Sequence, residues 1–133
     1  MAMRVAQYRL PGEGAEDASL VVFRFAGNGT IQQNFARWVG QFQQPDGRSS
    51  VEVAKTRQFY AGGLPIYVLD VTGIFVAETR PGSGVRENKQ DWRMIGAVAE
   101  ASDELVFVKA TGPDATLERW SASIDAFLHR LVE

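Results

Sequence analysis

Residues 57–75 read RQFYAGGLPIYVLDVTGIF, and this stretch decides the class of fold. Two runs rich in aromatic and β-branched residues, 57–61 and 64–75, flank the pair Gly62-Gly63. Glycine readily adopts the positive φ angles of a tight hairpin turn, so the stretch predicts two antiparallel strands. The sheet is therefore expected to be built largely from antiparallel neighbours.

The segments on either side of this hairpin also have the patterns of strands. Residues 4–10 alternate between two faces, and residues 20–26 are apolar on both faces apart from Arg24. The first pattern is typical of a strand with one buried face, and the second of a strand covered on both sides. Residues 92–101 and 105–111 predict a second hairpin, because they flank a short polar turn.

Two segments have the spacing of an amphipathic helix. In the first, apolar residues recur along one stripe that ends at Phe42, with Thr30 or Asn28 as the expected N-cap and residues 44–47 as the stop. The second follows Thr111, which is its expected cap. The apolar stripe of this last helix consists of Leu117, Trp120, Ile124, Phe127, Leu128 and Leu131.

The predicted order is strand, strand, helix, four strands in two hairpins, and a final helix. Proline and glycine are spread through the connections and form no linker, so residues 1–133 are expected to make a single domain. Strands that are apolar on both faces need cover on both sides. We therefore expect an α+β fold, an α/β/α sandwich in which a six-stranded, mainly antiparallel sheet carries one helix on each face.

The composition removes several classes of function. The 133 residues include no cysteine and one histidine, which excludes disulfides, thiol catalysis, zinc–thiolate sites and multi-histidine metal sites. The 14 basic and 16 acidic residues argue against a nucleic-acid partner, because such partners usually require a basic excess. No cofactor and no metal are predicted.

The beginning of the sequence does not have the pattern of a signal peptide, because Arg4, Gln7 and Arg9 interrupt any apolar core. No window approaches the roughly 18 to 20 apolar residues of a transmembrane helix. The sequence as it stands is thus expected to be soluble and cytoplasmic. If a signal precedes it in the natural protein, the expected location is periplasmic or exported.

His129 is the one candidate for histidine acid–base chemistry. On the last helix it points about 150° away from the centre of the apolar stripe, at 100° per residue. We therefore expect it to face water, which leaves no interior histidine for Ser-His-Asp catalysis.

Asn34, Arg37 and Gln41 line one flank of the first predicted helix, beside Trp38. An arginine and two amides next to an aromatic ring can bind a carboxylate, a sugar or the backbone of a partner. The alternative is structural, because such side chains also bond to neighbouring loops and hold a helix in its place.

Residues 77–91 have no periodicity, several glycine or proline breakers and six charges. A long connection of this kind is typical of a functional or mobile loop. We predict a lid or a partner-contacting loop, with plain disorder as the alternative. Its candidate binding residues are Arg80, Arg86 and Lys89.

Arg24, Asp70 and Lys109 are lone charges in otherwise apolar strands. Each needs a partner or a place near a sheet edge, because an unpaired buried charge is costly. If the three converge, they form a polar site on a face of the sheet. Otherwise they are ion-paired or exposed at strand ends.

Three strings resemble the PsbP-like α/β/α sandwich group. They are N-x-x-R-W-x-x-Q-F (Asn34, Arg37, Trp38, Gln41 and Phe42), WRMIG at residues 92–96 and FVKATGP at residues 107–113. The group includes an extrinsic subunit of photosystem II and a Ran-binding nuclear import factor. The chain most resembles small bacterial members, many of them exported and without an assigned activity. The resemblance implies the sandwich fold and a non-catalytic binding or assembly role, and it identifies no ligand.

The leading hypothesis is a non-catalytic binding or assembly module that contacts an unknown protein or small molecule through residues 77–91 and the Asn34 flank. The alternative is a small enzyme that uses carboxylate, lysine or arginine chemistry, with Asp70 and Lys109 in one pocket on a sheet face. A third hypothesis is a homo-oligomer whose sheet edge or tryptophan-rich face is the interface.

Overall fold

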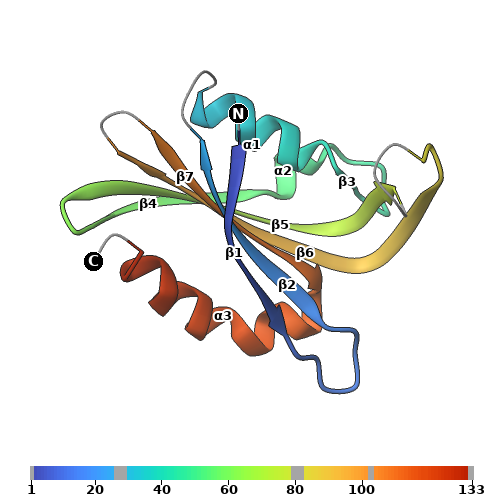
Figure 1. Cartoon of the computed structure of the whole chain (residues 1–133). Helices are drawn as coiled ribbons and strands as arrows, with labels where there is room; N and C mark the ends of the chain where they lie inside the picture. Colours follow the sequence, from blue (N-terminus) through green and yellow to red (C-terminus); the bar gives the residue numbers. More distant parts are fainter. Residues whose placement is uncertain (1, 26–29, 79–82, 102–103, 132–133) are drawn as a thin grey trace.

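An antiparallel sheet organises the chain (Figure 1). The computed structural model describes residues 2–25, 30–78, 83–101 and 104–131. The strands are β1 (Ala2–Leu10), β2 (Ala18–Phe25), β3 (Phe42–Gln43), β4 (Lys55–Ala61), β5 (Leu64–Glu78), β6 (Arg86–Glu100) and β7 (Leu105–Pro113). The helices are α1 (Ile31–Val39), α2 (Ser50–Val53) and α3 (Asp114–His129). The strand order is β1-β2-β7-β6-β5-β3, and β4 also pairs with β5.

The hairpin predicted around the double glycine is confirmed. β4 and β5 pair antiparallel with Ala61 opposite Leu64, and the turn residues Gly62 and Gly63 have φ angles of 59° and 80°. The α+β class and the antiparallel pairing are also confirmed. The predicted counts are wrong, because the described residues form seven strands where six were expected and three helices where two were expected.

The first helix is shorter than predicted. It begins after Thr30, whose side chain and that of Gln33 form a capping box, so one of the two expected N-caps is confirmed. It ends at Gly40, and Phe42 lies in β3 opposite Phe75, with the two ring centroids 5.2 Å apart. The helical spacing of Phe42 continued past the end of the helix because a buried strand position also demands an apolar residue.

The last helix begins later than predicted. Thr111 lies within β7, opposite Met94 of β6 and Ser19 of β2, so it is not the cap. Pro113 occupies the N-cap position and makes no side-chain cap hydrogen bond. Pairing with two neighbouring strands holds this backbone extended up to the helix.

No helix in the described part of the chain is long and apolar enough to cross a bilayer.

The prediction of a loop over residues 77–91 is wrong for most of its length. β5 continues to Glu78 and β6 begins at Arg86, and these two residues face each other in the ladder. A register irregularity separates this outer part of the hairpin from the rest, next to Asp91, whose φ is 55°. The outer ladder has no apolar alternation because its strands are held by backbone pairing and are largely exposed.

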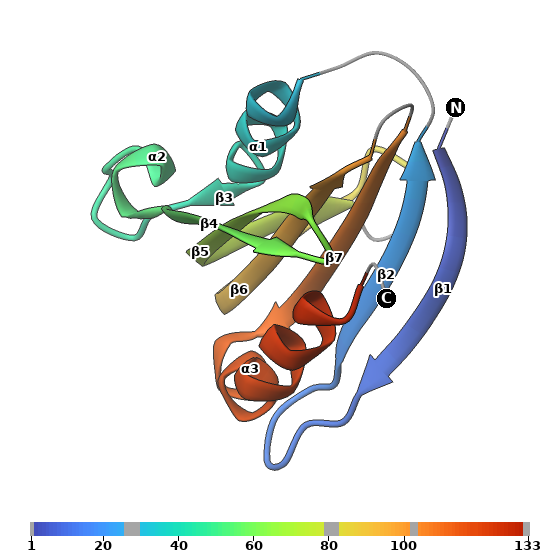
Figure 2. The same ribbon diagram turned by 90° about the vertical axis from the view of Figure 1, so that its left-hand side faces the viewer.

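Side chains that alternate along the strands form two separate cores, one on each side of the sheet. Figure 2 shows α1 on one side of the sheet and α3 on the other. Ile124 and Leu128 of α3 pack in one core, and Trp38 and Val39 of α1 pack in the other. The short helix α2 packs in the second core through Val53. We call the two sides the α3 face and the α1 face. Directly paired residues of neighbouring strands share a face, so the register assigns each strand residue to one of them.

The packing of α1 on the sheet depends on Gly96 of β6. Trp38 is 4% exposed and contacts the middle of β6 at Gly96, where an added Cβ would stand 2.5 Å from the indole Cζ3 and 2.6 Å from Cε3. The ring also makes an edge contact with Phe107, at a centroid distance of 5.9 Å. Only a residue without a side chain lets the indole approach the sheet this closely.

Candidate functional site

Lys109 stands at the centre of a polar cluster on the α1 face. In the register of β7 it lies between Gly96 of β6 and Val21 of β2, so it shares a face with the seat of Trp38. Its Nζ donates a hydrogen bond to Gln41 Oε1 at 3.2 Å and lies 5.7 Å from the centroid of the Trp38 ring. Although Lys109 and Gln41 are 68 positions apart in sequence, the fold brings them into contact.

Helix α1 supplies the other members of this cluster. The Arg37 Nη2 donates to Asn34 Oδ1 at 2.7 Å, and Asn34 Nδ2 donates to the Thr30 carbonyl at 2.9 Å. Asn34 is buried, with 6% of its surface exposed, whereas Arg37 is exposed. Asn34 thus orients the guanidinium, and Arg37 presents it to solvent. We refer to Asn34, Arg37, Gln41 and Lys109 as the Lys109 cluster.

The Lys109 cluster carries two cationic side chains, Arg37 and Lys109. Burial, and to a smaller extent the positive charge of Arg37, lowers the pKa of Lys109 to about 8. Among the described residues, no carboxylate forms an ion pair with either cation. Two neighbouring cations and an amide beside an aromatic ring are suited to a carboxylate or phosphate. The two hydrogen-bond acceptors of the Lys109 cluster, Asn34 and Gln41, are neutral amides, so the cluster itself contains no carboxylate.

On the opposite side of the sheet from the Lys109 cluster, Asp70 has a structural partner, Arg93. Arg93 donates to both of its carboxylate oxygens, from Nε at 2.8 Å and from Nη2 at 2.6 Å, and also to Glu118 of α3 at 3.0 Å. These hydrogen bonds to Asp70 are the main reason that the pKa of Arg93 is raised. This two-pronged pair ties β5 and β6 to α3.

Asp70 and Lys109 do not share a pocket. Asp70 lies opposite Ile95, whose side chain is in the core on the α3 face. Lys109 lies opposite Gly96, beneath Trp38 on the α1 face. Strand alternation separates the two charges, because Ile95 and Gly96 are consecutive residues that point to opposite faces. The structure does not form the catalytic pair that the enzyme hypothesis requires.

The remaining predicted site residues lie outside the Lys109 cluster. Arg24 is exposed and pairs with Glu104 through its Nε at 3.1 Å. Arg86 is exposed on β6, and Arg80 lies outside the described residues. Lys89 pairs with Glu87 at 3.1 Å, and this hydrogen bond is the first cause of its raised pKa. The ion pairs of Lys89 are with Glu87 and Glu16, outside the Lys109 cluster.

His129 lies at the surface, as predicted, with 49% of its side chain exposed. Its ring stacks on Phe59 at a centroid distance of 4.1 Å, and its Nδ1 is 2.8 Å from the Asp125 carbonyl. These contacts close the end of the α3 core. Over the part of the chain that the structure describes, no three histidine, aspartate or glutamate side chains gather as a metal site would require.

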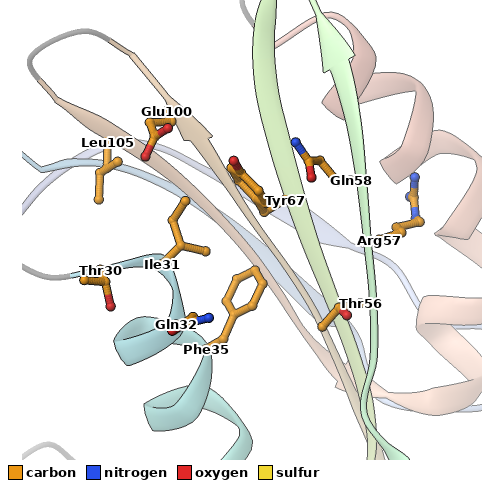
Figure 3. Close-up of a pocket in the computed structure, with 10 residues that line it drawn as sticks. All are labelled: Thr30, Ile31, Gln32, Phe35, Thr56, Arg57, Gln58, Tyr67, Glu100 and Leu105. Atoms are coloured by element: carbon orange, nitrogen blue, oxygen red, sulfur yellow. The ribbon is translucent and has the colours of Figure 1, made fainter.

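A groove that the sequence did not reveal lies on the other flank of α1. It has a volume of about 770 Å³ and runs between α1 and the strands β4 and β5. Figure 3 shows Phe35 and Ile31 on the helix side and Tyr67 and Gln58 on the strand side, all pointing toward the groove. The sequence pattern does not predict this groove, because its lining comes from α1 and from the strands β4, β5, β6 and β7, which only the tertiary fold places together.

The Asp70–Arg93 pair leads to a testable prediction about stability. Replacing Arg93 by methionine is expected to lower the free energy of unfolding by about 2 kcal/mol, because Asp70 then keeps its charge without a partner in a half-buried position. Urea denaturation measures the change. Adding Asp70→Leu to Arg93→Met removes the stranded charge and is expected to restore about half of the loss. An unchanged stability of the single variant would contradict the structural role.

Comparisons with known proteins bear on the fold alone. No protein-family model matches the sequence. No curated protein matches it either. Among solved structures, the chain is similar to PA94 of Pseudomonas aeruginosa, a protein of unknown function described as a candidate regulator. The TM-score is 0.60 at 17% identity, and the match covers 96% of this chain and 81% of the other.

Proposed function

We propose that this protein is a non-catalytic binding domain of PsbP-like type that recognises an anionic group, a carboxylate or a phosphate, at the Lys109 cluster. The observation that carries the proposal is the half-buried ammonium of Lys109 beside the guanidinium of Arg37, with no carboxylate from the described residues between them. Partial burial of a cation without an acid partner is unfavourable, and a bound anion would reverse that cost.

The residues of the proposed site coincide with part of the family resemblance. The string N-x-x-R-W-x-x-Q-F contributes Asn34, Arg37 and Gln41 to the Lys109 cluster, and the centroid of its Trp38 ring lies 5.7 Å from the Lys109 Nζ. In the string FVKATGP, the third residue is Lys109 itself. Support for the PsbP-like assignment comes from these strings together with the antiparallel α+β fold.

Each member of the Lys109 cluster has a distinct role in the proposed binding. Lys109 supplies a charge on the rigid sheet, held by the hydrogen bond to Gln41 Oε1. Arg37 supplies a second charge from the helix, oriented by Asn34. Because Gln41 and Asn34 accept these hydrogen bonds as neutral amides, both cations keep their charge for the ligand. The ligand is expected to lie against the edge of α1 above β7.

Replacing Arg37 by glutamine tests this proposal directly. Within the described part of the chain, the exposed guanidinium of Arg37 makes one hydrogen bond, to Asn34. The melting temperature is therefore expected to stay within about 2 °C of that of the unmodified protein. Affinity for phosphate and for succinate, measured by NMR titration, is expected to fall about tenfold. Comparing the two anions shows which of them the site prefers.

The matched control is Arg86→Gln, which removes another exposed arginine from the outer part of β6. It is expected to leave both affinities unchanged. Equal losses of anion affinity in Arg37→Gln and Arg86→Gln would mean that binding depends only on the net charge of the protein. That result, or an unchanged affinity of Arg37→Gln, would contradict the proposal.

The pH dependence of binding gives a second prediction. Since the pKa of Lys109 is about 8, its ammonium is largely charged at pH 7 and largely neutral at pH 9. Affinity for sulfate, whose charge is constant over this range, is expected to fall between about threefold and tenfold from pH 7 to pH 9. In Lys109→Met, the weaker affinity that remains is expected to be flat. A pH dependence that survives in this variant would show that another group is responsible.

A further inference from the structure

β4 is an open edge of the sheet. Among the described residues it pairs with β5 alone, so the backbone groups on its outer side face no strand of this chain. The opposite edge, β1, has an irregular register between Arg4 and Ala6, of the kind that deters a further strand. β4 runs for seven residues without such an irregularity. Of the two edges, β4 is therefore the better template for strand addition.

A concavity lies on each side of this edge. On the α1 face is the groove of about 770 Å³, which β4 borders through Thr56 and Gln58. On the α3 face is a smaller pocket of about 200 Å³, which β4 borders through Lys55 and which Asp125 of α3 lines from the other side. Side chains of an extended strand alternate between two faces. A strand added to β4 would thus direct its residues alternately toward the two concavities.

The two concavities differ in chemistry. The groove on the α1 face is walled by the apolar or aromatic side chains of Ile31, Phe35 and Tyr67 (Figure 3). On the α3 face, β4 contributes the cations Lys55 and Arg57, which lie opposite Asp70 and Val68 in the register. The strand itself has no acidic residue. Apolar side chains suit the first side, and a carboxylate suits the second beside Lys55.

The same charges argue against a second copy of this chain as the occupant. Two β4 strands paired edge to edge would bring four cations, Lys55 and Arg57 of each copy, onto one face of the joined sheet. Among the described residues, Arg57 has an acidic partner, Asp125 at 2.6 Å, and Lys55 has none. Like charges across paired strands are destabilising. An acidic strand from a different protein avoids this repulsion.

We propose that β4 binds an extended segment of a partner protein by strand addition, with apolar side chains entering the groove on the α1 face and carboxylates alternating with them toward Lys55. This surface lies on the flank of α1 opposite to Arg37, because residues 31 and 35 are rotated by about 120° and 160° from residue 37 at 100° per residue. It is therefore separate from the proposed anion site and does not depend on it.

The probe is a capped seven-residue peptide, matched to the length of β4, in which glutamate alternates with valine. The comparison peptide replaces each glutamate by lysine. The glutamate peptide is expected to bind about tenfold or more tightly than the lysine peptide. When the glutamate peptide binds, the changes in amide chemical shift of the whole protein are expected to concentrate in Lys55–Ala61. Hydrogen exchange is expected to slow at the same amides.

The variant Gln58→Glu places a charge on the groove side of β4, at a position that is exposed in the free protein. It is expected to weaken the glutamate peptide about tenfold, since the new carboxylate opposes both the valines and the negative charge. Gln90→Glu makes the same change at an exposed strand position outside the groove and is expected to have little effect. Both variants are expected to keep the melting temperature of the unmodified protein.

Three results would overturn the proposal. The first is equal affinity for the two peptides. The second is that Gln58→Glu and Gln90→Glu have the same effect on binding. The third is a concentration-dependent dimer in sedimentation experiments with protected amides in β4, because a second copy of the chain would then be the occupant of this edge.

Discussion

Replacing Gly96 by alanine is expected to lower the free energy of unfolding by about 2 to 3 kcal/mol. The new methyl carbon would stand 2.5 Å from one atom of the Trp38 ring and 2.6 Å from another, far inside van der Waals contact. The indole is 4% exposed and is enclosed by the core on the α1 face, so it cannot turn away without moving α1. Urea denaturation with two spectroscopic probes measures the effect.

Gly40→Ala is the matched control for this change. Gly40 has helical dihedral angles at the end of α1, and its added methyl would meet the carbonyl oxygen of Ala36 at 3.3 Å. Its stability is expected to change by less than about 1 kcal/mol. The double variant Gly96→Ala with Trp38→Leu is expected to be more stable than the sum of the single losses predicts, because the clash needs the indole. Strict additivity would contradict the proposed steric cause.

Replacing Lys109 by methionine is expected to raise stability at pH 7 by about 1 to 2 kcal/mol and to abolish most of the anion binding. Burial lowers the pKa of Lys109 to about 8 from its ordinary value of 10.5, so folding at pH 7 includes the cost of desolvating an ammonium. Methionine has a similar length and no charge, and removes this cost. Thermal and urea denaturation measure the gain in stability, and NMR titration with phosphate measures the loss of binding.

The sign of the pH dependence provides an independent check. Below pH 8 the lysine is charged in both the folded and the unfolded chain, and the full desolvation cost is present. Between pH 8 and about 10.5 the folded protein loses this proton while the unfolded chain retains it, so Lys109 makes stability rise with pH across that window. The difference in stability between the methionine variant and the unmodified protein is therefore expected to shrink from pH 7 to pH 10.

Lys55→Met serves as the control for this substitution, because Lys55 is an exposed lysine on another strand. Its free energy of unfolding is expected to change by less than about 0.5 kcal/mol, and its affinity for phosphate is expected to stay the same. If Lys109→Met lowered stability instead, the lysine would have a structural role beneath Trp38. A residue whose removal stabilises the fold while it removes binding is retained for function, and that combination is the outcome expected here.

The candidate site was predictable in part. Asn34, Arg37 and Gln41 could be assigned to one flank of a helix because helical spacing is a local property of the sequence. Lys109 could be identified as a charge in an apolar strand, but its contact with Gln41 spans 68 positions and depends on how α1 lies on the sheet. Of the three lone charges, Lys109 thus joins the polar flank of α1 in one cluster, whereas Asp70 and Arg24 do not.

The errors have a common physical origin in pairing between distant parts of the chain. Residues 86–91 lack apolar alternation, yet they form part of β6 because β5 offers its backbone as a partner. Thr111 has the chemistry of a helix cap, yet it belongs to β7 because Met94 and Ser19 flank it. In both cases backbone hydrogen bonds to neighbouring strands outweigh the local preference.

By itself, the sequence determined the local features of this protein: the glycine turn at residues 62–63, the apolar stripes of α1 and α3, and the absence of cysteine and of an interior histidine. Only the tertiary structure decided that Asp70 and Lys109 lie on opposite faces and that a groove flanks β4. The reason is that turns and stripes depend on the chemistry of residues a few positions apart. Strand register depends on pairing across the whole chain, and a shift of one residue would move every side chain of a strand to the other face.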